Sequence, residues 1–454
     1  MMTLPDKERL ERRLNSFDSA TRRDALAALA AFNESALPAP GGNVNLHCHS
    51  FFSYNAFGWS PSRLAWEARK RGFRACGLCD FDVLDGMDEF LAAGHVLGLR
   101  TCVHLETRAY VAEQAADDIN SPGEPGVTYI MGGGFTSLPE PGSAQATFLE
   151  SLRQGARDRN EALISRINTA LPQIALDYEK DILPRTPKGV ATERHIVAAY
   201  VDKAVAVFPD PAFRTAFWEP LVKKDSAEAM ATEASDRPTF EEWARAALSK
   251  RGGIGYVPPT SSTFPPVDDF IAWVRACDAI PLVTWLDGTR PGEASADALL
   301  DLMTAKGCAG VNIIPDRNWN FSDPAKAGKM AANLDAMVKA ADARGLPIVI
   351  GTEMNKLGLP IVDDLDGPVL SKYRESFLRG ADILVGHTLL SRVAAMPYLG
   401  GKAADAFPSV KDRNDFFAAV GALPPVTEEL FESLLDIGPE RAFTRLADAV
   451  RARA

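Results

Sequence analysis

The sequence of 454 residues has few cysteines, no low-complexity tract and no long apolar run. Its first residues, MMTLPDKERLERRL, are polar and charged, unlike a secretory signal peptide. No apolar run reaches membrane-spanning length, so we expect no membrane partner and a cytoplasmic location. Six cysteines in a chain of this length do not indicate a disulfide scaffold.

An excess of basic residues is also absent. Lysine and arginine number 49 against 60 aspartates and glutamates, which gives a formal net charge of −11. This balance argues against a broad surface for nucleic acid, although a local arginine cluster in a pocket remains compatible with it. With 46% hydrophobic and 24% charged residues the chain is typical of a globular protein, of two or three domains unless one is a barrel.

Cys76 and Cys79 form the one closely spaced cysteine pair. A zinc knuckle would need a second such pair, or two histidines at loop spacing, and neither is available. Because the pair lies in an apolar, strand-like run, we interpret it as buried core thiols, with redox or metal chemistry as the alternative.

Short apolar runs alternate with helical patterns over much of the chain. The expected strands span 44–49, 75–80, 100–111, 127–131, 280–285, 310–314, 346–351 and 383–387. Such alternation indicates parallel strands joined by helical crossovers. Seven or eight units can close a barrel, whose active groups gather at the C-terminal ends of the strands.

Helical patterns dominate three other regions. Residues 6–36 predict a helix, residues 145–270 a helical subdomain inserted over one rim of the barrel, and residues 428–454 an amphipathic helix interrupted at Gly438-Pro439. The expected organisation is therefore an N-terminal extension (1–40), a barrel (41–144 and 271–400), an insertion (145–270) and a C-terminal extension (401–454).

The segment from Val44 to Ser50 carries the strongest functional signal. Residues two apart in a strand share a face, so His47 and His49 point the same way while Leu46 faces apolar packing. Two imidazoles directed together can hold one divalent cation better than either alone.

Further motifs follow in a characteristic order. They are Asn45-Leu-His-Cys-His-Ser-x-x-Ser53, Ser60-Pro-Ser, Ala68-Arg-Lys-Arg-Gly72, Leu78-Cys-Asp-Phe-Asp82, Leu105-Glu106, Arg157-Asp-Arg-Asn160, Thr192-Glu-Arg-His-Ile196, Gly255-Tyr-Val-Pro258, Ile280-Pro-Leu-Val-Thr-Trp285 and Gly351-Thr-Glu-Met-Asn355. In order and spacing this series resembles the PHP (polymerase and histidinol phosphatase) superfamily over residues 43–360.

That resemblance implies a distorted (β/α)7 barrel with helical insertion and extensions, which binds divalent metal ions and hydrolyses phosphate esters. It assigns a first metal site to His47, His49, Glu106 and Glu353. Two imidazoles and two carboxylates suit one Zn²⁺, Mn²⁺ or Fe²⁺ ion. The alternatives are that Glu106 pairs with Arg108 or a lysine and that Glu353 is solvated.

The other family ligands are replaced. Tyr54 stands for an aspartate, Phe81, Tyr129 and Trp285 stand for histidines, and Asn355 stands for the final histidine. Phenylalanine and tryptophan do not coordinate metals, and tyrosine and asparagine are poor substitutes for imidazole. The resemblance therefore predicts that one metal site is kept and two are erased.

The remaining polar candidates have weaker signals. Asp80 is expected to accept a hydrogen bond that orients a ligating histidine. His195, at a predicted helix start, is a candidate catalytic or phosphate-binding residue, with a surface role as the alternative. His387 is expected at the end of the last strand facing the barrel mouth, His104 is a minor ligand candidate, and His95 is expected to face solvent.

Positive charge for a substrate would come from side chains near the strand ends. The candidates are Arg108, Arg194, Arg290, Arg317 and Lys356. The aromatic residues Trp285, Trp319, Tyr54, Phe81 and Tyr129 are expected to line a rather apolar pocket.

Three functional hypotheses follow. The first is a one-metal phosphoesterase acting on a small phosphate ester or a nucleotide. The second is a relative that has lost hydrolysis and binds a metal or ligand. The third is hydrolysis of a C–N bond, because paired histidines on the first strand also open amidohydrolase barrels; the lack of a suitably placed lysine and of further histidines disfavours it.

Overall fold

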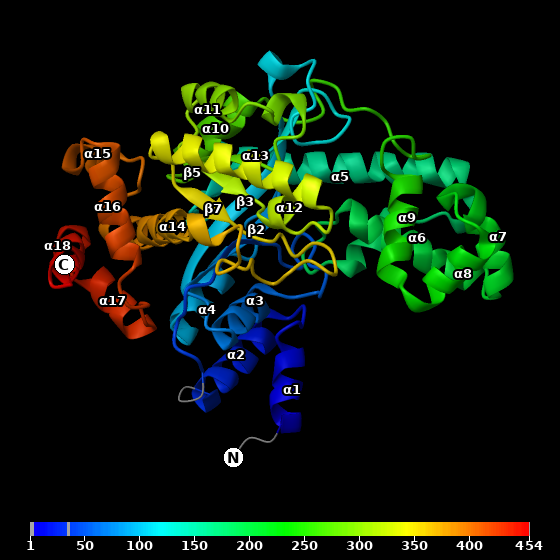
Figure 1. Cartoon of the computed structure of the whole chain (residues 1–454). Coiled ribbons are helices and arrows are strands. Elements are labelled where there is room, and N and C mark those ends of the chain that lie inside the picture. The colour runs from blue at the N-terminus through cyan, green and yellow to red at the C-terminus, as the bar shows by residue number, and fades with distance from the viewer. Residues whose placement is uncertain (1–3, 34–36, 454) are drawn as a thin grey trace.

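A seven-stranded sheet that curves into a nearly closed barrel forms the centre of the protein (Figure 1). The computed structural model describes residues 4–33 and 37–453. The strands lie in sequence order at β1 (Val44–Cys48), β2 (Ala75–Phe81), β3 (Arg100–Tyr110), β4 (Val127–Gly133), β5 (Ile280–Trp285), β6 (Gly310–Ile313) and β7 (Ile348–Ile350). A bridge between Cys48 and Glu353 joins β1 to the segment just after β7. The predicted α/β barrel is thus confirmed.

One strand runs against the expected direction. β4 pairs antiparallel with both β3 and β5, whereas the other neighbouring strands are parallel, so the prediction of uniformly parallel pairing is wrong at β4. The connection from β3 to β4 has no crossover helix to return the chain to the other end of the barrel. As a result the start of β4, with Tyr129 opposite Arg108, lies at the same end as the C-terminus of β3.

The eighth expected strand, 383–387, is wrong. These residues lie within the helix α14 (Arg374–Ala394) and are buried on all sides. A short apolar run that is buried all round has no periodicity that separates a strand from a helix. Gly380 and Gly386 allow this close packing, because a Cβ at either position would lie 2.0 Å from a carbonyl oxygen, of Ile348 or Phe417.

Helices cover the outside of the barrel, and α14 packs across the end where the parallel strands begin. The covering helices are α3 (Pro61–Lys70), α4 (Met87–Leu97), α10 (Val267–Ala276), α11 (Ala296–Ala305), α12 (Asp316–Trp319) and α13 (Pro324–Ala343). Asp382 on α14 receives two hydrogen bonds from Arg74, which precedes β2, at 2.9 and 2.6 Å. The end of the barrel where the parallel strands begin is therefore sealed, which leaves the opposite end for a site.

The insertion between β4 and β5 is helical and has its own apolar core. Its helices are α5 (Ala144–Ala170), α6 (Glu193–Val207), α7 (Pro211–Val222), α8 (Ser226–Ser235) and α9 (Arg237–Leu248). Ile167, Tyr200, Trp218 and Phe240 are fully buried in that core. The insertion projects to one side of the barrel (Figure 1).

The two terminal extensions are also helical. The N-terminal region forms α1 (Leu4–Arg13) and α2 (Ser19–Asn33), not one continuous helix. The break arises because the Asp18 carboxylate accepts the Thr21 N–H at 2.8 Å and caps a new helix. Residues 34–36 of the predicted helix lie outside the described residues.

The C-terminal extension packs beside α14 on the opposite side from the insertion (Figure 1). It contains α15 (Gly401–Ala406), α16 (Val410–Gly421), α17 (Glu428–Asp436) and α18 (Pro439–Arg451), and the predicted break at Gly438-Pro439 separates the last two. Short 3-10 or π turns occur at Ala112–Gln114, Pro172–Ile174, Tyr178–Ile182, Leu183–Arg185, Pro291–Glu293 and Ser371–Tyr373.

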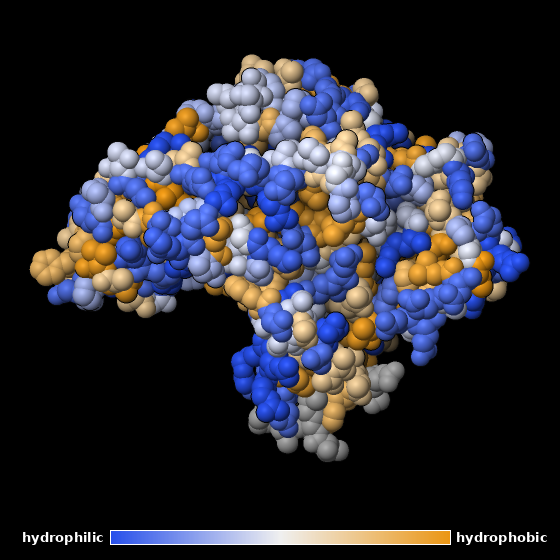
Figure 2. Space-filling model, turned by 180° about the vertical axis from the view of Figure 1, so that it is seen from behind, coloured by the Kyte–Doolittle hydropathy of each residue, from blue (hydrophilic) through white to orange (hydrophobic). Residues whose placement is uncertain are grey.

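The surface carries no continuous apolar band on the face seen from behind. Hydrophilic residues cover much of that face, and apolar residues lie in separate patches (Figure 2). Within residues 4–33 and 37–453, no helix combines the length and apolar character needed to cross a membrane. Cys76 and Cys79 are buried and unbridged, in accord with their interpretation as core thiols.

Candidate metal centre

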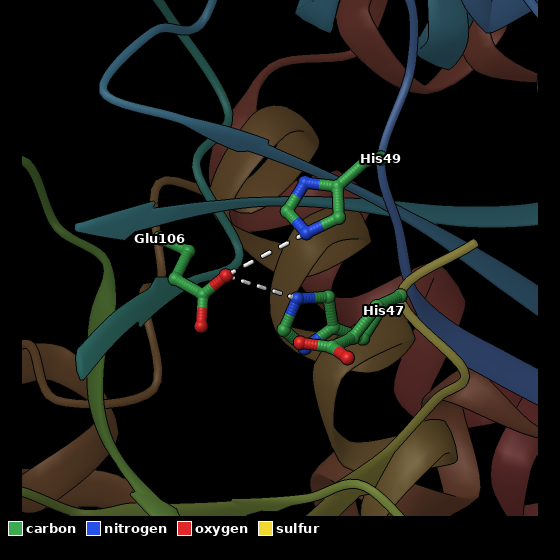
Figure 3. A group of neighbouring side chains, drawn as sticks. His47, His49 and Glu106 are labelled. Atoms are coloured by element: carbon green, nitrogen blue, oxygen red, sulfur yellow. Dashed lines mark ion pairs between the residues drawn. The ribbon is translucent and has the colours of Figure 1, made fainter. Parts of the chain in front are cut away.

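Four side chains from three separate parts of the sequence meet at the end of the barrel where the parallel strands finish. His47, His49, Glu106 and Glu353 each offer one ligand atom, and these atoms all lie within 4.8 Å of one another. The two histidines are fully buried and Glu106 is 2% exposed. Figure 3 shows both imidazoles directed toward the Glu106 carboxylate.

The spacing of these atoms suits a shared cation better than direct hydrogen bonds. Glu106 Oε2 lies 3.4 Å from His47 Nε2 and 3.6 Å from His49 Nε2, beyond the usual range of an N–H···O hydrogen bond. Two ligands at tetrahedral angles around a Zn²⁺ ion would be separated by about 3.4 Å. All three atoms are buried without a hydrogen-bond partner, and burying polar atoms in this way is costly unless something else satisfies them. The residues therefore fit a divalent cation.

Backbone hydrogen bonds fix the fourth residue beside the first strand. The Glu353 N–H donates to the His47 carbonyl at 2.8 Å, and the His49 N–H donates to the Glu353 carbonyl at 3.0 Å. Glu353 and Met354 adopt left-handed backbone conformations, with φ of 60° and 57°. Such conformations cost energy in residues other than glycine and concentrate at functional sites.

Each imidazole also has a partner on its other nitrogen. His47 Nδ1 lies 3.3 Å from Asn312 Oδ1 on β6. His49 Nδ1 lies 3.3 Å from Ser53 Oγ, which in turn donates to Asp80 at 2.6 Å. Asp80 thus contacts His49 through Ser53. Sequence reasoning gave no role to Ser53 or Asn312, although the spacing of Ser53 within the histidine motif was a signal.

The charge state of the group follows from its burial. Burial disfavours the imidazolium of His47, but contact with Cys79 and the negative charge of Glu106 outweigh it and raise the His47 pKa well above its usual value. Burial, aided by the positive charges of His47 and Arg194, lowers the His49 pKa well below its usual value. Burial also raises the pKa of Glu106, against the effect of His47. Burial thus disfavours the charge on His49 and on Glu106, whereas the charge on His47 is favoured.

Aromatic rings surround one side of the group. Phe81 stacks on His49, with ring centroids 4.5 Å apart and planes 14° from parallel, and Tyr129 lies 6.2 Å beyond it. Trp285 lies elsewhere, contrary to expectation. Its neighbour Thr284 is in register with Asn312, which faces the barrel interior, so Trp285 points outward.

Trp285 and Trp319, both expected to line the pocket, each make a contact that shows where the ring lies. On the outer face, the Trp285 ring packs beside Gly288, where an added Cβ would lie 3.2 Å from Trp285 Cζ2. Trp319 is partly buried and donates to Asp363 at 2.9 Å. Of the expected aromatic residues, Phe81 and Tyr129 lie beside the four-residue group, and Tyr54 packs against His195.

Three of the five candidate substrate-binding cations, Arg317, Arg194 and Arg108, pair with acids. Arg317 Nη2 lies 3.4 Å from Glu353 Oε2, and the Arg317 side chain is 43% exposed. The Arg194 guanidinium pairs with Glu242 and lies 5.6 Å from the centre of the Tyr54 ring.

Arg108 pairs with Glu124 at 3.0 Å, so the alternative in which it neutralises Glu106 is wrong. Its guanidinium lies 4.2 Å from the centre of the Phe264 ring, and Arg159 lies 4.8 Å from the same ring. Lys356 and Arg290 are exposed.

His195 lies outside the four-residue group. Its Nδ1 accepts the Thr192 N–H at 3.1 Å at the start of α6, and its ring packs edge-on against Tyr54. Burial and the positive charge of Arg185 lower its pKa to about 4, so it is neutral at pH 7. With Nδ1 engaged as an acceptor, Nε2 carries the hydrogen, and His195 is suited to donate a hydrogen bond.

The other histidines have structural roles. His104 Nε2 lies 3.2 Å from Cys102 Sγ within the barrel, and Gly134 N–H donates to its Nδ1 at 3.3 Å. His387 is buried on α14, 2.8 Å from the Gly134 carbonyl, and not at the mouth as expected. His95 is partly buried against Phe431 instead of facing solvent.

Comparison with known proteins gives distant structural likenesses. No family model and no curated protein matches the chain. A protein assigned as a metal-dependent phosphoesterase from Bifidobacterium adolescentis is 19% identical, with a TM-score of 0.43 over 75% of this chain and 98% of the other. An amidohydrolase from Chromobacterium violaceum, with bound sulfate and no metal, is 17% identical, with a TM-score of 0.45 over 74% of this chain and 96% of the other.

Proposed function

We propose that this protein is a metal-dependent hydrolase of the PHP type, which uses one divalent cation to hydrolyse a small phosphate ester or a nucleotide. The observation that supports the proposal is the convergence of His47 Nε2, His49 Nε2 and Glu106 Oε2, all buried and without a hydrogen-bond partner. Glu353 adds a second carboxylate. Two nitrogen and two oxygen donors suit Zn²⁺, Mn²⁺ or Fe²⁺, and such a cation would supply Lewis acidity toward water and a phosphoryl oxygen.

The side chains around the site would bind and orient the substrate. Arg317 is half exposed and contacts Glu353, so its guanidinium can bind a phosphoryl oxygen beside the metal ligands. Arg194, Arg108 and Lys356 are further candidates for phosphate contacts. His195 can donate from Nε2, since its Nδ1 is already an acceptor.

The second candidate function is a metal- or ligand-binding module without hydrolysis. The stacking of Phe81 on His49 favours it, because an aromatic ring occupies a position where the family has a ligand. A single cation then lacks the second positive charge that stabilises the leaving oxygen in two-metal phosphatases.

Metal analysis and a substrate screen separate these functions. After loading with Zn²⁺ or Mn²⁺ we expect about one equivalent of metal, which the double variant His47→Ala/His49→Ala should lose. The matched control His95→Ala should keep it, because His95 packs against the C-terminal extension. Absence of bound metal in the wild-type protein would refute the proposal.

Turnover is then measured on phosphomonoesters, nucleotides and short oligonucleotides, with simple amides as a test of C–N hydrolysis. Phosphate release by the loaded protein, with a raised KM and unchanged metal content in Arg317→Met, is the expected result. Metal binding without turnover would support the binding module.

A further inference from the structure

Asp80 accepts three hydrogen bonds from the loop that follows β1. Its carboxylate is 1% exposed and receives the Ser50 N–H at 2.8 Å, the Ser50 hydroxyl at 2.6 Å and the Ser53 hydroxyl at 2.6 Å. All three groups are donors, so Asp80 acts here as an acceptor only.

The Ser53 hydroxyl donates its single hydrogen to Asp80. Its contact with Asp80 at 2.6 Å is a short, charge-assisted hydrogen bond, whereas its contact with His49 Nδ1 is 3.3 Å long. A hydroxyl has one hydrogen to donate and lone pairs with which to accept. Ser53 must therefore accept from His49, which requires a hydrogen on Nδ1 and leaves Nε2 without one.

The bare Nε2 of His49 faces another acceptor. Glu106 Oε2 lies 3.6 Å away, and both atoms are buried without a hydrogen-bond partner. Two electron-rich atoms at this distance repel each other unless a positive charge lies between them. The direction of the Ser53 hydrogen bond thus prepares His49 to bind a cation.

We infer that Ser53, held by Asp80, is a positioning residue that selects the tautomer of His49 in which Nε2 is free to coordinate a metal. This inference rests on the proposed metal site. Partners on the outer nitrogen of a ligating histidine are known to fix its tautomer and orientation, and their loss typically weakens metal affinity 10–100-fold.

The tautomer is measured directly in the metal-free protein. With ¹⁵N-labelled histidine, and His49 assigned by comparison with a His49→Gln variant, we expect the wild-type spectrum to show His49 with hydrogen on Nδ1. Ser53→Ala should lose this preference and Ser53→Thr, which keeps the hydroxyl, should restore it. Ser50→Ala is the matched control, because it removes a hydroxyl from the same carboxylate without touching His49.

Zinc affinity, measured by competition with a chromophoric chelator, provides the second readout. Ser53→Ala should bind about 10–100-fold more weakly than the wild type. A wild-type His49 with hydrogen on Nε2 would overturn the inference even if the variant fails to fold, and so would unchanged tautomer and affinity in a folded Ser53→Ala. Wild-type protein with the Nδ1–H tautomer but no zinc binding would instead refute the proposed function.

Discussion

The backbone N–H of Glu353 donates to the carbonyl of His47 at 2.8 Å, at the point where the first and last strands of the barrel meet. The distance between this acid and the two imidazoles is therefore set by the closure of the barrel, and less by side-chain flexibility. We call this backbone contact between His47 and Glu353 the seam. A change that disturbs the seam should weaken metal binding even when every ligand is kept.

Gly351 offers a direct test of the seam. A Cβ at this position would lie 2.4 Å from both Asn45 Oδ1 and His47 N, so Gly351→Ala should push β7 away from β1. We expect a loss of about 1–3 kcal/mol in the free energy of unfolding, measured with urea, together with weaker zinc binding. Gly401→Ala is the control, since no atom lies within 4 Å of its added Cβ. Wild-type stability and affinity in Gly351→Ala would contradict this account.

Glu106→Gln should separate metal binding from stability. The variant keeps the shape of the side chain but removes the charge, and we expect zinc affinity to fall by at least about 100-fold, more than for an outer partner of a ligand. The free energy of unfolding of the metal-free protein should change by less than this, because burial, which raises the Glu106 pKa, opposes the attraction between this carboxylate and His47. Chelator competition and urea unfolding provide the two measurements. The exposed Glu113→Gln should change neither, and wild-type affinity in Glu106→Gln would exclude Glu106 as a ligand.

Glu293 should make stability depend on pH. Its carboxylate is 1% exposed and accepts the N–H groups of Leu286, Asp287 and Gly288, and burial raises its pKa to about 7. Between about pH 4.5 and 7 the folded state keeps a proton that the unfolded state has lost. The contribution of this group is thus present below pH 4.5 and is lost as the pH rises toward 7, by at most about 1.4 kcal/mol per pH unit.

The measurement is urea unfolding of wild type and Glu293→Gln at pH 5, 6 and 7. The wild type should lose stability relative to the variant as the pH rises. Asp80 and Asp363, whose pKa values burial raises to about 6 and about 7, titrate in the same range in both proteins, so the difference isolates Glu293. A difference that does not change with pH would show that Glu293 titrates normally.

The ion pair between Arg74 and Asp382, at the end of the barrel where the parallel strands begin, should contribute measurably to stability. Arg74 donates two hydrogen bonds to Asp382, which is 6% exposed. Asp382→Asn should cost about 2 kcal/mol, the scale of hydrogen bonds to charged groups. Asp415→Asn, which breaks the exposed pairs of Asp415 with Lys411 and Arg379, should cost less than about 1 kcal/mol. Equal losses in the free energy of unfolding for the two variants, measured with urea, would contradict the larger contribution expected of the Arg74–Asp382 pair.

Local patterns were sufficient for much of the fold. Seven of the expected strands form close to their predicted bounds, because their apolar runs are short and bounded by turns. The pairing of His47 with His49 likewise follows from strand alternation, and it persists although β1 carries an irregularity between Asn45 and Cys48.

Other features depend on contacts between distant segments and left no local signal. Residues 383–387 of α14 looked like a strand because this part of the helix is buried on all sides. The direction of β4 depends on the path of the chain between residues 111 and 126. The prediction for Trp285 was wrong because the sequence does not show which face of β5 points into the barrel; the register of Thr284 with Asn312 on β6 shows it.

The sequence by itself determined which residue types could hold a cation and that they follow strands, because side-chain chemistry and strand periodicity are local properties. The resemblance of the motifs named Glu106 and Glu353 as partners of the two histidines, but only the tertiary structure decided the distances at which the four side chains meet, and that Ser53 and Asn312 contact the outer nitrogens of the imidazoles. Those contacts arise when the barrel closes and brings β1, β3, β6 and the end of β7 together, which no stretch of sequence encodes alone.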